Sequence, residues 1–117
     1  MAFRPDDLVR QAAEAYSLDA VDFAREHFRV SLDWSDGSVE RLERILDTFH
    51  RQLGAAKPTD DQIMGFAKMF GSYVGEVLRR HHGAAWGIVS MGDETYPGMH
   101  FEGPGGEFWP WGRVRNR

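Results

Sequence analysis

The spacing of apolar side chains predicts helices over the first two-thirds of the chain and strands over the last third. The clearest helix follows a turn at residues 35–38, where Ser38 suits a helix cap and Gly54 suits the residue after the helix end. Its apolar stripe recurs every three or four positions: Val39, Leu42, Ile45, Leu46, Phe49 and Leu53. Charged residues fill the rest of its surface, so we expect an amphipathic helix that packs one side on the core.

The N-terminal region predicts two shorter helical segments. The first spans residues 5–16, with Pro5 in the first turn and two aspartates at the positive end of the helix dipole. Ser17 or Asp19 would cap the second segment, which keeps a helical spacing of apolar residues as far as Phe28.

Residues 28–34 alternate strictly between apolar and polar side chains, which is the period of a strand. The run is short. An extended linker lying on the core explains the pattern as well as a strand does, and both interpretations stay open.

A helix over residues 60–82 is predicted to form the centre of the fold. Thr59 and Gln62 match a capping box. Apolar residues occur around most of its circumference, which is typical of a buried helix. Three glycines interrupt it, at a cost of about 1 kcal/mol each relative to alanine: Gly65, Gly71 and Gly75. Either Gly71 and Gly75 let a neighbouring backbone approach closely, or the glycines make room for a ligand or for the backbone of a partner.

The last third predicts short strands joined by turns, over residues 86–91, 99–102 and 107–111. Consecutive short strands of this kind form antiparallel meanders. The sequence therefore predicts an α+β fold, with three to four helices packed on one face of a small three-stranded antiparallel β-meander. We expect a single domain over residues 1–117, helical over 1–82 and β-rich over 84–117.

Composition narrows the class of protein. The 117 residues are 42% hydrophobic and 27% charged, which are ordinary values for a globular domain. Because the chain has no cysteine, disulfides, thiolate catalysis and cysteine-ligated metal sites are excluded. The N-terminus lacks the apolar run of a signal peptide, and no apolar stretch approaches the roughly 20 residues that span a bilayer. These features predict a cytoplasmic protein without a membrane partner.

Charge is distributed unevenly along the chain. The formal net charge is −4, but the first 62 residues carry 8 Lys/Arg and 13 Asp/Glu. An acidic helical half is unsuited to a phosphate backbone, so we do not expect nucleic acid as a partner. The basic residues at the C-terminal end are interpreted as a solvated tail: Arg113, Arg115 and Arg117.

One segment carries a resemblance. Residues 70–76 read Phe-Gly-Ser-Tyr-Val-Gly-Glu and are followed by Gly83 and Trp86. With residues 32–38 and 108–117, this pattern resembles an uncharacterised family of small bacterial proteins, in which such a helix precedes a hairpin that opens with tryptophan. The resemblance covers about residues 20–117 and implies a bacterial origin. It implies no catalytic residues.

Glu76 is the main candidate for chemistry, because an unpaired buried carboxylate is costly. Arg80, four residues later, can pair with it, and so could Arg79 or a strand residue; such a pair would be structural. The alternative is a functional carboxylate with a raised pKa. The five histidines have no metal-ligand spacing, and no nucleophile elbow or phosphate-binding loop occurs, so neither a metal nor a cofactor is expected.

Two functions remain open. The leading hypothesis is a non-enzymatic protein-interaction domain, immunity-like or regulatory, whose partner is a basic protein surface or a second copy of the chain. Trp109 and Trp111 belong either to the core or to such an interface. The alternative is a small ligand-binding or hydrolytic domain, with Glu76, Tyr73 and His100 around a pocket between the central helix and the sheet.

Overall fold

The computed structural model describes residues 2–56, 59–101 and 106–108, and it has the predicted α+β class. Three helices are present in this part of the chain: α1 (Asp7–Phe28), α2 (Asp36–Ala56) and α3 (Asp60–His81). Four strands form one sheet: β1 (Ala2–Pro5), β2 (Ala84–Met91), β3 (Glu94–Phe101) and β4 (Gly106–Phe108). The strands lie in the order β1-β2-β3-β4, and all neighbours are antiparallel.

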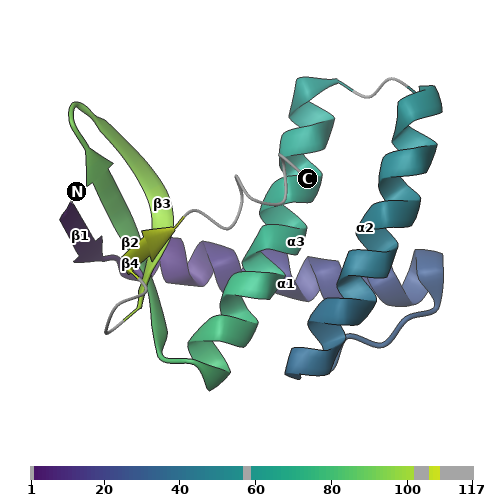
Figure 1. The fold of residues 1–117 in the computed structure, drawn as a ribbon, viewed down its shortest axis with the longest axis horizontal. Coiled ribbons are helices and arrows are strands. Elements are labelled where there is room, and N and C mark those ends of the chain that lie inside the picture. Colours follow the sequence, from purple (N-terminus) through teal and green to yellow (C-terminus); the bar gives the residue numbers. More distant parts are fainter. Residues whose placement is uncertain (1, 57–58, 102–105, 109–117) are drawn as a thin grey trace.

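The helices do not all cover the sheet (Figure 1). α1 and α3 pack against β2 and against each other, whereas α2 stands on the far side of α3, away from the strands. The prediction that every helix packs on one sheet face was therefore wrong for α2. Two core clusters result, one shared by the three helices and one between the sheet, α1 and α3.

The predicted meander is present as β2-β3-β4, but the first strand was missed. Residues 2–5 pair with β2, with Phe3 opposite Val89 and Pro5 opposite Gly87. Pro5 was predicted to open a helix; instead it ends an edge strand, a position that tolerates the missing backbone donor. Asp6 caps α1, since its carboxylate accepts a hydrogen bond from the backbone N–H of Val9 at 2.9 Å.

α1 is one continuous helix, so the predicted division near Ser17 was wrong. Ser17 is buried, and its hydroxyl donates to the carbonyl of Glu14 at 2.7 Å within the helix. Residues 29–34 form no strand. They are the extended linker of the second interpretation, with Leu32 only 3% exposed in the helical core.

The helix boundaries differ slightly from the prediction. α2 begins at Asp36, so Ser38 lies inside its first turn, and α2 continues through Gly54 to Ala56. The capping box of α3 is present, with both the Thr59 and Gln62 hydrogen bonds formed. None of the helices in the described part has the length and apolarity needed to cross a bilayer.

The β2–β3 hairpin is tighter than predicted. A turn at Gly92 and Asp93 joins the strands, and Gly92 has a positive φ of 61°. β3 therefore includes Pro97, which the sequence placed in a loop. Among the described residues, β4 pairs with residues 99–101 and Pro97 pairs with Ile88 of β2.

Candidate functional site

Glu76 lies in α3 with none of its side chain exposed. Arg79 donates two hydrogen bonds to its carboxylate, from Nε to Oε2 at 2.7 Å and from Nη2 to Oε1 at 3.0 Å. The indole Nε1 of Trp86 in β2 donates a third, to Oε2 at 3.0 Å. Arg80, the partner predicted first, is more distant, with Nη2 at 3.8 Å from Oε1. The buried carboxylate is thus neutralised and hydrogen-bonded from both sides.

The Arg79 guanidinium links this buried group to the surface. It is 31% exposed and lies 3.7 Å from Glu14 of α1, which in turn pairs with Arg10 at 2.7 Å. The hydrogen bonds to Glu76, and the charges of Glu76 and Glu14, raise the pKa of Arg79 above its ordinary value. The pair therefore joins α3 to both α1 and β2, which is the arrangement of a structural ion pair.

Gly75 makes room for the Trp86 indole. A Cβ at residue 75 would lie 2.2 Å from Cζ2 of Trp86 and 3.0 Å from Sδ of Met99. Of the two predicted roles, close approach by a neighbour is the observed one. The neighbour is a side chain of the sheet rather than a backbone, and the space is filled.

Tyr73 lies one turn earlier in α3 and serves the linker. Its hydroxyl accepts a hydrogen bond from the backbone N–H of Trp34 at 2.9 Å and lies 2.5 Å from the hydroxyl of Ser38. Its ring lies 4.9 Å from the Trp34 ring. Tyr73 and Ser38 are both completely buried, so this polar pair fixes the linker and the start of α2 to the central helix.

The C-terminal end of α3 closes over the same linker. The Arg80 guanidinium lies 3.9 Å from the centre of the Trp34 ring, and Nε2 of His81 lies 2.8 Å from the Trp34 carbonyl oxygen. Nε2 of His82 lies 2.8 Å from Oδ1 of Asp36. The sequence analysis assigned Arg80 to Glu76 and placed none of these three side chains on the linker. Their role in holding the linker depends on contacts between distant parts of the chain.

His100 lies away from the other candidates. It is in β3 directly after Met99, whose side chain faces α3, so His100 points to the opposite face of the sheet. There its ring stacks on Phe3, with centroids 5.1 Å apart. Glu76, Tyr73 and His100 are therefore not brought together. Trp109 and Trp111 lie outside the described residues.

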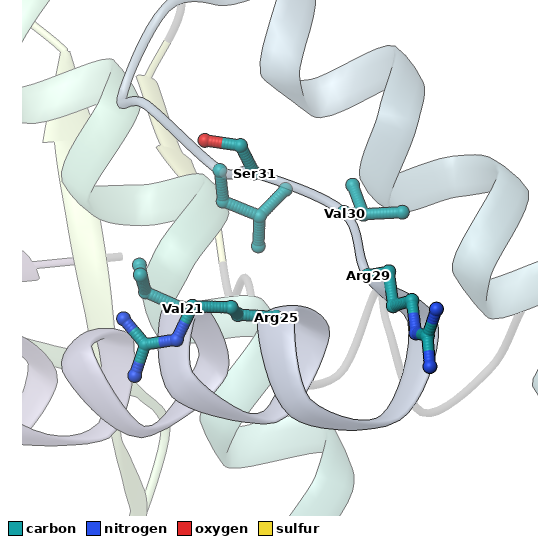
Figure 2. Close-up of a pocket in the computed structure, with 6 residues that line it drawn as sticks. Val21, Arg25, Arg29, Val30 and Ser31 are labelled. Atoms are coloured by element: carbon teal, nitrogen blue, oxygen red, sulfur yellow. The ribbon is translucent and has the colours of Figure 1, made fainter.

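Two clefts border the linker between α1 and α2, and the sequence analysis did not predict them. The larger, of about 350 Å³, is lined by Val21, Arg25, Arg29, Val30, Ser31 and Leu32 (Figure 2). The smaller, of about 240 Å³, is lined by Phe28, Val30, Arg41, Arg44, Ile45 and Thr48. The sequence contained one indication that this region is unusual. Arg29 follows Phe28 at the end of α1, a position where glycine is the usual residue. Within the described residues, no three His, Asp or Glu side chains are grouped to hold a metal ion.

Comparison with known proteins identifies a fold and not a family. No family model and no curated protein matches the chain. A crystal structure of a protein from Bacteroides thetaiotaomicron VPI-5482 at 1.50 Å resolution is similar, with a TM-score of 0.68 and 13% sequence identity. The match covers 98% of this chain and 41% of that one, so this chain spans less than half the length of the protein it resembles. At this identity the likeness concerns the fold alone, and membership of the bacterial family stays a prediction.

Proposed function

We propose that this chain is a non-enzymatic protein-interaction domain. The observation that carries the proposal is the state of Glu76, the one completely buried carboxylate among the described residues. Arg79 and Trp86 occupy its oxygens, and the Trp86 indole fills the space beside Gly75. A carboxylate with these contacts stabilises the packing of α3 on β2. We therefore assign the function of the protein to its surface and not to Glu76.

The alternative function, ligand binding or hydrolysis between α3 and the sheet, has less support. It calls for a buried carboxylate without a counter-charge, whereas Glu76 has Arg79 within hydrogen-bonding distance. It also calls for Tyr73 and His100 beside that carboxylate. Tyr73 instead contacts the linker, and His100 stacks on the other face of the sheet.

An immunity-like or regulatory role and a cytoplasmic location are part of this proposal. The acidic face proposed for a basic partner lies on α2, where Glu40, Glu43 and Asp47 are exposed. Arg44 and Arg51 are exposed on the same helix, so this face is of mixed charge. A mixed face gives weaker electrostatic attraction than a uniformly acidic one, and this favours a contact elsewhere on the helical half.

The test is native mass spectrometry of the full chain, purified at low salt from the cells that produce it. A protein partner or a second copy bound in fixed stoichiometry supports the proposal. A reproducible adduct of metabolite or metal size, lost in a Glu76→Gln variant and kept in Glu40→Gln, contradicts it and favours the ligand-binding alternative. Reversal of charge at Glu40, Glu43 and Asp47 then asks whether the α2 face is the contact: it slows association at low salt if so.

A further inference from the structure

The linker between α1 and α2 gathers arginines in a chain that is otherwise acidic. Arg25 and Arg29 line the larger cleft, Arg41 and Arg44 line the smaller one, and Val30 lies between them and lines both. The residues that line these two clefts are here called the linker groove. We propose that the linker groove is the docking site for an acidic segment of a partner protein that carries apolar side chains. This inference rests on the proposed interaction function and names its site and partner class.

The groove is preformed. The Val30 N–H donates to the carbonyl of Ala24 at 3.1 Å, which turns the chain back along α1. Nε of Arg41 donates to the Ser31 carbonyl at 3.0 Å, and Leu32 is anchored in the helical core. Because the linker is held at both ends and in the middle, a partner can bind without the cost of ordering it.

Two of the four arginines are available for a new ion pair. Within the described residues, the guanidinium groups of Arg29 and Arg44 have no hydrogen bond or ion pair, and both side chains are exposed. Arg25 and Arg41 each pair with one aspartate at 3.0 Å, through a single nitrogen in each case. A guanidinium carries five N–H donors in a planar fork, so even these two retain donors for a carboxylate.

Arg29 adopts a backbone conformation that its side chain does not favour. Its φ of 54° and ψ of 37° place it in the left-handed region at the end of α1, where glycine is the usual residue. Strain of this kind persists where the surrounding structure holds it, here through the helix-end hydrogen bonds to Ala24, and it is enriched at functional sites. With no described residue bound by its guanidinium, the intramolecular contacts do not account for an arginine at this position.

The chemistry of the lining specifies the ligand. Figure 2 shows the Arg25 and Arg29 side chains extending in opposite directions, and Val21, Val30 and Leu32 supply the apolar part of the lining. A ligand with carboxylates on both sides of an apolar side chain satisfies both arginines and the apolar lining. The second cleft repeats this pattern beyond Val30, with two arginines around Phe28 and Ile45. A peptide segment with several side chains suits two adjoining clefts better than one small anion does.

The test uses a phage-displayed library of random peptides of about twelve residues, selected on the full-length protein at low salt. We expect enriched peptides to carry aspartate or glutamate on both sides of an apolar residue. The dissociation constant of a synthetic enriched peptide is then measured by fluorescence anisotropy. It should rise at least about tenfold in the Arg29→Gly/Arg44→Gln double variant. It should stay within about twofold in Arg4→Gln/Arg51→Gln, which removes the same charge from exposed positions outside the linker groove.

Several results would contradict the proposal that the linker groove is a docking site. They are enrichment of neutral or basic peptides, no enrichment at all, or equal losses in the two double variants. Light scattering tests whether the linker groove binds a second copy of the chain instead. If the protein is a dimer and the Arg29→Gly/Arg44→Gln variant is a monomer, the occupant of the groove is a second copy and not an acidic partner segment. If native mass spectrometry finds a partner that binds this variant unchanged, the interaction function stands and the groove fails. A small-molecule adduct without any partner rejects the function itself.

Discussion

Trp86 and Gly75 fit each other: the six-membered part of the indole occupies the space in which any larger residue at position 75 would place its Cβ. The same tryptophan donates its N–H to the buried Glu76 carboxylate. Sheet and central helix are therefore joined by one side chain that makes both an apolar and a polar contact. A buried tryptophan adds a large apolar area to a core, and its N–H usually finds a hydrogen-bond partner, as it does here.

Gly75→Ala should destabilise the protein despite the better helix propensity of alanine. The added Cβ would meet Cζ2 of Trp86 at 2.2 Å and Cη2 at 2.5 Å, so the indole must shift. We expect a loss of about 1–3 kcal/mol in the free energy of unfolding, measured by urea denaturation. Gly65→Ala is the matched control, because nothing lies within 4 Å of its Cβ position. It should stabilise by about 0.5–1 kcal/mol. Equal effects of the two substitutions would contradict the contact.

Glu76→Gln tests whether the buried carboxylate is structural. Glutamine still offers an acceptor to Trp86 but leaves the partly buried Arg79 without its close counter-charge. We expect the free energy of unfolding to fall by about 1–3 kcal/mol. Arg10→Gln removes a half-exposed pair with Glu14 and should cost less than about 1 kcal/mol. If Glu76→Gln instead stabilised the protein, the carboxylate would be strained in the manner of a functional site.

The central helix was the most predictable part of the fold. Thr59 and Gln62 mark its start, Gly83 follows its end, and the apolar residues between them repeat over many turns. Local rules of this kind depend on neighbouring residues alone, so the sequence contains them in full. The β2-β3-β4 order was predictable for the same reason, since short connections join antiparallel neighbours.

The features that sequence analysis missed depend on distant contacts. β1 has only four residues, and its strand character comes from pairing with β2 more than eighty positions away. Arg79 and Arg80 lie three and four residues after Glu76, so either could reach it along the helix. Contacts with the rest of the fold determine that Arg79 makes the close ion pair. The linker was equally ambiguous, because Trp34 is fixed by Tyr73 and His81 rather than by its sequence neighbours.

Asp33 should make the linker sensitive to acid. Hydrogen bonds from the hydroxyl and then the backbone N–H of Ser35, together with the charge of Arg41, hold the pKa of Asp33 below its ordinary value of 3.8. A carboxyl with a lowered folded pKa stabilises the protein above the unfolded value, and this stabilisation is lost as the pH falls through the folded one. The urea midpoints of wild type and Asp33→Asn should therefore differ at neutral pH and converge below about pH 4. Asp93→Asn, in the exposed β2–β3 turn, is the matched control for removing one aspartate away from the linker.

Arg29→Gly should raise stability, although it removes a large side chain. Glycine adopts the left-handed conformation at this position without steric cost, whereas a non-glycine residue there loses about 1–2 kcal/mol. Part of that gain is offset by the greater freedom of glycine in the unfolded chain, so we expect a net increase of about 0.5–1 kcal/mol in urea denaturation. Arg25→Gly, four residues earlier and inside α1, should have the opposite sign, with a loss of about 1 kcal/mol. A destabilising Arg29→Gly would mean that the guanidinium supports the fold. A stabilising one would show that the fold does not require an arginine at this position.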